Sequence, residues 1–156
     1  MKKNYFLLSM ALLGLNTLAQ EYKMPVQSVT SKQPSQPGNE PVFSADGILT
    51  TMYHSKWNQS GIPDQLDFSF SNQVKSIKSL IYYPRQTGTN GNWTNVEILY
   101  STKDDPANFK TATATALTWA GDATSKKFEF DKEIINPAVI SIKVNAAVGS
   151  FSNAAE

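Results

Sequence analysis

The chain has 156 residues, of which 40% are hydrophobic and 17% are charged, and it contains no cysteine. This length suits a single domain with a normal core, and the missing cysteines exclude disulfides, thiol nucleophiles and thiolate metal sites. Without Lys2 and Lys3 the formal charge of +1 becomes −1, with 12 Lys and Arg against 13 Asp and Glu, so the chain lacks the basic surface that binds nucleic acid or an anionic membrane.

Residues 1–20 are typical of a secretory signal peptide. Two lysines near the start precede the short apolar run Tyr5–Leu15, and Thr17–Ala19 has the small-x-small pattern of a cleavage site. The apolar run is too short to be a stable membrane anchor, so we expect no membrane insertion. The sequence therefore predicts a secreted bacterial protein, periplasmic or extracellular, whose mature domain is residues 21–156.

The first part of the mature chain is poor in regular structure. Four prolines between Glu21 and Pro41 exclude a long helix, and only Val26–Ser31 alternates well enough to predict a short edge strand. A compact loop is expected to begin at Phe43–Thr51, with Met52–Trp57 directly after it.

Beyond residue 64 the chain becomes a series of segments in which apolar and polar residues alternate. This period of two predicts strands, and helical spacing is confined to a single turn near Pro106–Phe109. The expected strands are residues 65–70, 74–83, 93–101, 126–130 and 139–144. Many short strands joined by Gly, Pro and Asn turns indicate an all-β fold, an antiparallel β-sandwich or jelly roll.

The stretch Tyr82–Trp93 contains a strand end, a tight loop and the start of another strand. Pro84 ends the first strand, and three residues are expected to supply the positive φ angles of the loop, namely Gly88, Asn90 and Gly91. Arg85 is the only arginine, and a guanidinium beside Thr, Asn and Gly is suited to an oxygen-rich neutral ligand. Alternatively, Arg85 ties down carbonyls of its own loop.

Catalytic patterns are nearly absent from the sequence. With one histidine, no cysteine and scattered carboxylates, no Ser/His/Asp order or metal-ligand spacing can be defended. Asp104 and Asp105 are adjacent in a turn and are expected to be solvated. We therefore expect a protein that is not an enzyme.

Several short motifs occur in a characteristic order. They are Ser44–Gly47, Thr51, His54–Ser55, Trp57, Tyr83–Arg85, Asn90–Gly91, Val96–Ser101 and Ala154–Glu156. In order and spacing they resemble the discoidin domain, which is the coagulation factor V/VIII type C fold, and more narrowly the bacterial carbohydrate-binding modules of family 32. The similarity covers Val26–Glu156.

The resemblance implies a sugar-binding site on loops at one end of the jelly roll. His54, Arg85 and Asn90 match the family's hydroxyl-binding positions, while Trp57 and Phe151 are candidates to stack on the sugar ring. It implies a non-catalytic module for glycans ending in galactose, N-acetylgalactosamine or a related host sugar, of a kind attached to a glycoside hydrolase or peptidase in fuller-length relatives.

Two alternatives remain open at this point. His54 is also compatible with a hydrogen-bonded structural histidine, although its place among the matched positions favours the binding role. The domain as a whole is compatible with discoidin-type cell adhesion or protein binding, which predicts an exposed apolar patch on the loops in place of the His/Arg/Asn cluster.

The resemblance also implies a structural calcium ion at the loop that begins at Phe43. Asp46 and Thr51 would supply side-chain oxygens, Phe43 and Ile48 carbonyls, and Glu156 a carboxylate. The alternative is an Asp-Gly turn in which Asp46 accepts hydrogen bonds from backbone amides.

The end of the sequence departs from the family pattern. In the family, the segment that matches Ala154–Glu156 opens a last strand that completes the sandwich, whereas this sequence stops at Glu156. Either the gene product is truncated, or the sandwich leaves a strand edge exposed, which invites association. This departure puts the stability of the fold and the role of Glu156 in question, and leaves His54, Arg85 and Asn90 untouched.

Overall fold

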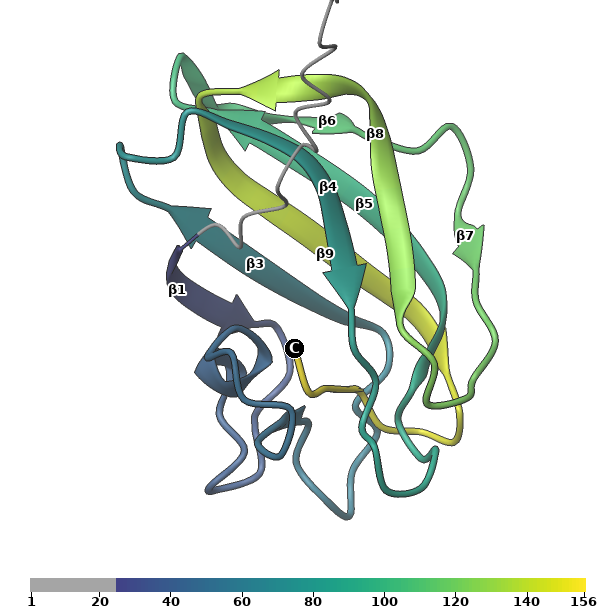
Figure 1. Ribbon diagram of the computed structural model, residues 1–156. Coiled ribbons are helices and arrows are strands. Elements are labelled where there is room, and N and C mark those ends of the chain that lie inside the picture. Colours follow the sequence, from purple (N-terminus) through teal and green to yellow (C-terminus); the bar gives the residue numbers. More distant parts are fainter. Residues whose placement is uncertain (1–24) are drawn as a thin grey trace, which may run out of the picture.

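The computed structural model describes residues 25–156, so the predicted signal peptide lies outside the described range. The described residues form strands and one short 3-10 helix, η1 (Figure 1). In chain order the elements are β1 Val26–Ser31, η1 Pro41–Ser44, β2 Tyr53–His54, β3 Asp64–Phe70, β4 Ser76–Tyr82, β5 Trp93–Thr102, β6 Asp105–Thr111, β7 Leu117–Thr118, β8 Lys126–Ile135, β9 Pro137–Ala147 and β10 Asn153–Ala154. Between residues 25 and 156, no helix is long and apolar enough to cross a membrane.

Two antiparallel sheets form a sandwich, as the sequence predicts. The larger sheet has the order β1-β3-β9-β5-β6, with β7 also pairing with β5, and the strands β4 and β8 form the second sheet. A third pair, β10 with β2, lies at the end of the sandwich where the loops after β4 and β9 also gather, at the bottom of Figure 1.

The core follows from the alternation along the strands. Leu66 of β3 lies opposite Ile142 of β9, which in turn lies opposite Ile98 of β5, so three buried side chains form a row across the larger sheet. Trp93 stacks on Tyr82 of β4 with ring centroids 4.2 Å apart, which joins the two sheets. Burying each such side chain contributes about 1.5–3 kcal/mol to folding.

The predicted strands agree with the structure, with one correction. β1 has the predicted bounds, and the strands predicted after residue 64 are all present, with β8 and β9 longer than expected. The single helical turn expected near Pro106–Phe109 is wrong, because these residues belong to β6. β6 lies at an edge of the larger sheet and pairs only with β5, so its side chains are exposed and show no alternation.

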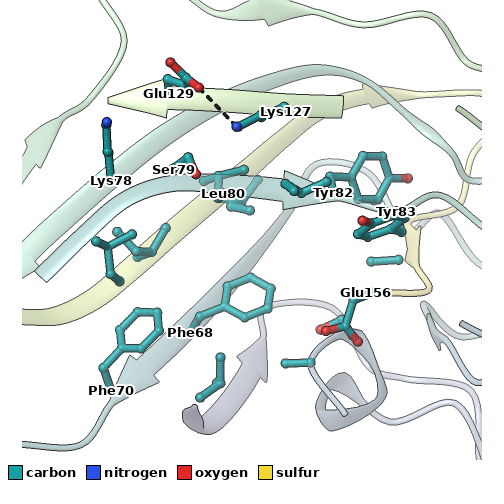
Figure 2. A pocket seen from close by; sticks show the side chains of 18 of the residues that line it. Phe68, Phe70, Lys78, Ser79, Leu80, Tyr82, Tyr83, Lys127, Glu129 and Glu156 are labelled. Carbon is teal, nitrogen blue, oxygen red and sulfur yellow. Dashed lines mark ion pairs between the residues drawn. The ribbon is translucent and has the colours of Figure 1, made fainter. Parts of the chain in front are cut away.

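A groove of about 820 Å³ lies between β4 and the larger sheet (Figure 2). Phe68 and Phe70 of β3 line it and are only half-buried, whereas Leu66 on the same face of β3 is fully buried. At one end of the groove, the Tyr83 amide donates to the carbonyl of Glu156 at 2.8 Å. Within the described residues, β4 has no strand partner on the edge away from β8, so this edge of the sandwich is exposed.

Candidate functional site

His54 is held by the short strand β2. The strand pairs with β10, with Asn153 opposite His54, and its other residue, Tyr53, is anchored by donating a hydrogen bond to the buried Asp64 carboxylate at 2.8 Å. His54 itself is only 3% exposed. Its Nδ1 lies 2.6 Å from the carbonyl oxygen of Ser55. Because a carbonyl can only accept, Nδ1 carries the proton and Nε2 is the acceptor of the neutral ring.

The surroundings of His54 favour this neutral form. Burial lowers the pKa of His54 below its ordinary value of 6.5, and the positive charge of Arg85 lowers it further, while the hydrogen bond to Ser55 acts in the opposite direction. The ring is therefore neutral at pH 7, with a lone pair on Nε2.

Arg85 lies just beyond β4, after Pro84. No hydrogen bond joins its side chain to any residue in the described part of the chain, and its buried Nε has no partner. The alternative that Arg85 ties down carbonyls of its own loop is therefore not what the structure shows. A buried donor without a partner is costly, so this guanidinium is suited to an external acceptor.

The loop between β4 and β5 is fixed by backbone bonds to the chain after β9. The Gly91 amide donates to the carbonyl of Val148 at 2.7 Å, and the Asn153 amide donates to the carbonyl of Gly91 at 3.0 Å. Gly88 and Gly91 have positive φ angles of 82° and 88°, as predicted. The prediction of a positive φ angle for Asn90 is wrong, because the positive φ angle is at Gly91, the residue that follows it.

Asn90 and Phe151 are brought together by Gly149. A Cβ atom at Gly149 would lie 2.3 Å from Oδ1 of Asn90, and φ there is +74°, so the backbone approaches the amide more closely than a side chain would permit. Two residues later, the ring of Phe151 lies 5.3 Å from that of His54. The Asn90 amide and an aromatic ring thus reach the same place from distant segments.

The five predicted sugar-binding residues line one pocket of about 400 Å³. Its lining consists of Met52, His54, Trp57, Asn58, Arg85, Asn90 and Phe151. Trp57 packs edge-on against His54, with centroids 6.2 Å apart, and is still 54% exposed, so its ring is available to a ligand. The sequence did not predict Met52 or Asn58, since neither lies in one of the motifs that carry the family resemblance.

The loop after η1 brings together most of the predicted calcium ligands. Asp46 accepts hydrogen bonds from the Thr51 hydroxyl at 2.6 Å and from the Ile48 amide at 2.9 Å, and Glu156 accepts one from the Gly47 amide at 2.8 Å. The bond to Ile48 is the amide-capping geometry of the alternative interpretation. The described residues contain no cluster of three or more His, Cys, Asp or Glu, so a cation here would rely on two carboxylates together with hydroxyl and carbonyl oxygens.

Phe43, the remaining predicted calcium ligand, lies in η1 at the start of this loop. Its amide donates to the carbonyl of Glu40 at 3.0 Å. Among the described residues, no hydrogen bond joins Phe43 to the Asp46 carboxylate.

Comparison with known families identifies the family of this chain. The model of the F5/8 type C domain matches residues 27–156, which is most of the chain. The chain belongs to the F5/8 type C domain family. The resemblance to the discoidin fold seen in the sequence is thereby confirmed.

Structures of family 32 carbohydrate-binding modules are similar to this F5/8 type C domain. The module of NanJ from Clostridium perfringens, in complex with galactose, is 26% identical and has a TM-score of 0.69, covering 83% of this chain and 89% of that one. The module CpGH89CBM32-5 from the same organism, in complex with GalNAc-β-1,3-galactose, shares the fold at 24% identity and a TM-score of 0.70, covering 83% and 91%.

One curated relative is a much longer protein. The A type blood N-acetyl-α-D-galactosamine deacetylase of Flavonifractor plautii is 31% identical over 112 residues. The matched region is 71% of this chain and 14% of the relative. The chain therefore corresponds to a small part of that relative's length.

Proposed function

We propose that this F5/8 type C domain is a secreted, non-catalytic carbohydrate-binding module for glycans ending in galactose, N-acetylgalactosamine or a related sugar. The observation that carries the proposal is the single pocket into which His54, Trp57, Arg85, Asn90 and Phe151 converge from three separate segments. The galactose-bound and GalNAc-β-1,3-galactose-bound modules described above support the choice of sugar.

The chemistry of the pocket suits a neutral sugar. Nε2 of neutral His54 accepts from a hydroxyl, the Arg85 guanidinium donates to ring or hydroxyl oxygens, and the Asn90 amide does either. Trp57 and Phe151 offer apolar faces to the C–H groups of the ring. A few polar groups that fix orientation within a partly aromatic pocket are typical of small-molecule sites.

We further propose that the domain serves a larger glycan-active protein. The curated relative that it matches over 14% of that protein's length is a deacetylase, and another similar structure joins two such modules to the M60 catalytic domain of ZmpB. We propose a glycoside hydrolase or peptidase as the context of this chain. In that setting the module holds the catalytic unit near its glycan and carries out no chemistry.

A glycan array tests the proposal. The mature domain, residues 21–156, is expected to bind glycans that end in galactose or N-acetylgalactosamine in preference to those that end in glucose or mannose. The glycans must be presented densely on the array. A single site binds one sugar weakly, so several sites must bind together to retain the protein. Uniform absence of signal on a multivalent array would contradict the proposed function.

The family's protein-binding role remains as a second candidate because of one observation. Val42, Ile48 and Leu49 are large apolar side chains that are about half exposed; all lie within residues 42–49, and none of them lines the pocket. Two results together would favour this candidate. The array would show no sugar binding, and the domain would bind a protein ligand with an affinity that Val42→Ser lowers.

His54 predicts how sugar binding depends on pH. Since the pKa of His54 lies below 6.5, affinity is expected to stay constant from pH 8 to about 6.5 and to weaken at lower pH, as protonation converts Nε2 into a donor. Folding stability should also decline as pH falls below about 6.5, because the unfolded chain then takes up the proton first. Calorimetric titration at each pH, with melting temperatures measured in parallel, separates the two effects.

The control for this prediction is His54→Gln. Between pH 8 and pH 5 its affinity should be low and nearly independent of pH, because the chain has no other histidine and Arg85 keeps its charge. A wild-type affinity that stays flat across the range would mean that His54 does not accept a hydrogen bond from the sugar.

We propose a structural role for calcium at the loop after η1. Asp46, Thr51 and Glu156 would supply side-chain oxygens and Ile48 its carbonyl, a set of hard oxygen ligands that fits Ca²⁺. Phe43 would contribute its carbonyl from η1. The ion would fix the loop and the chain beside Glu156, and it would take no part in sugar chemistry.

Calcium is expected to raise the melting temperature of the domain. At a concentration a hundredfold above the dissociation constant, binding adds about 2.7 kcal/mol, which corresponds to roughly 8 °C for a domain of this size. Asp46→Asn should remove most of this increase, whereas Asp104→Asn, which changes a carboxylate outside the loop, should keep it. An unchanged melting temperature in millimolar calcium would mean that Asp46 only caps backbone amides.

A further inference from the structure

Two residues other than glycine have positive φ angles in the described part of the chain. They are Asn58, with φ of 64°, and Asn136, with φ of 49°. Left-handed backbone is unfavourable for a residue with a side chain, and Asn tolerates it better than most. Each of the two therefore calls for a structural or functional reason.

The reason is clear for Asn136, which forms the turn between β8 and β9. Its amide donates to the carbonyl of Lys75 at 2.7 Å, and its own carbonyl accepts from the Lys103 amide at 2.8 Å. This turn lies at the end of the sandwich opposite the pocket, at the top of Figure 1. At Asn136 the left-handed conformation serves the fold.

Asn58 also lies in a turn, which it forms with Trp57 on the surface. Its side chain makes no hydrogen bond with any residue from 25 to 156, and it lies on the surface. It follows the exposed Trp57 and lines the pocket together with His54 and Arg85. The left-handed turn therefore brings to the pocket an amide side chain that has no hydrogen-bond partner among the described residues.

We propose that Asn58 is a further sugar-binding residue, whose left-handed backbone sets its amide at the rim of the pocket to hydrogen-bond a polar group of the sugar. The inference rests on the proposed function and deepens it. The side-chain amide both donates and accepts, so it suits either a hydroxyl or an acetamido group. Together with Trp57 it makes the rim amphipathic, with an aromatic face beside a polar group.

Replacement by glycine separates the amide from the backbone conformation. Glycine adopts positive φ without strain, so Asn58→Gly removes the side chain and preserves the turn. Asn136→Gly is the matched control, since it makes the same change at the other left-handed asparagine. Affinity for methyl galactoside and for N-acetylgalactosamine is measured by calorimetry, with the melting temperature of each variant.

Asn58→Gly is expected to weaken sugar affinity about fivefold, the value of one neutral hydrogen bond, with an unchanged or slightly higher melting temperature. Asn136→Gly should bind as the wild type does. Wild-type affinity in Asn58→Gly, or equal losses in both variants, would overturn the role of Asn58 while leaving the proposed function intact. If the wild type itself binds neither sugar, the proposed function fails, and the role of Asn58 fails with it.

Discussion

Replacing Arg85 with alanine is expected to abolish measurable sugar binding while changing the melting temperature by no more than about 2 °C. The side chain makes no hydrogen bond to the rest of the described chain, so the fold loses little when it is removed. A bound sugar loses several charge-assisted hydrogen bonds, each worth about 1.5–3 kcal/mol, so the affinity should fall at least a hundredfold. Calorimetric titration with galactose and thermal unfolding measure the two effects separately.

Arg85→Lys is the informative companion to this variant. It keeps the charge and loses the planar arrangement of donors, so binding should be weak but should exceed that of the alanine variant. If Arg85→Ala unfolds the domain, Arg85 has a structural role. If the variant folds and binds sugar as the wild type does, Arg85 does not bind the sugar and the pocket has been assigned to the wrong ligand.

Replacing Asp64 with alanine is expected to lower stability by about 3–5 kcal/mol, or roughly 10–15 °C in melting temperature. The carboxylate is 3% exposed and accepts hydrogen bonds from the Tyr53 hydroxyl at 2.8 Å and from the Ser31 hydroxyl at 3.0 Å. It also accepts from the amides of Gln33 and Gln65. Without Asp64, the network loses its central acceptor, and the Ser31 hydroxyl is left as the partner of Tyr53 and of the Gln33 amide. Thermal unfolding measures the loss.

The ionisation of Tyr53, which can be followed by absorbance, reports on the same hydrogen-bond network. Burial raises the pKa of Tyr53 far above its ordinary value, and the negative charge of Asp64 raises it further. In Asp64→Ala the phenol should therefore ionise at lower pH than in the wild type, as followed by ultraviolet absorbance. Asp67→Ala, on the same strand but only half-buried, is the control and should change stability little. Equal losses in both variants would contradict the special role of Asp64.

The sequence predicted those strands whose two faces differ. In β3, the alternation of Leu66, Phe68 and Phe70 with polar residues is the pattern of a strand with one buried face. β6 has no such pattern because it is exposed nearly throughout, and its strand conformation comes from pairing with β5. The two-residue strands β2 and β10 were beyond prediction for a related reason, since each is defined by a partner about a hundred residues away.

The candidate site was predicted mainly through the resemblance to a family. From the residues alone, only Arg85 and its Gly/Asn loop suggested a ligand, and spacing could not show that Phe151 would reach His54. Met52 carried no signal, and Asn58 carried only the general tolerance of asparagine for left-handed backbone. The φ angle of Asn58 depends on tertiary structure, so the sequence could not reveal that this residue was unusual.

Calorimetric titration of residues 21–156 with galactose and N-acetylgalactosamine at pH 7.5 tests most directly the claim that this pocket binds a galactose-type sugar. About a dozen heavy atoms at roughly −0.3 kcal/mol each give near −4 kcal/mol, which predicts a dissociation constant of about 1 mM at one site. Saturable binding in this range that disappears in Arg85→Ala is the expected result. Absence of binding to either sugar at tens of millimolar, or binding that persists in Arg85→Ala, would contradict the claim.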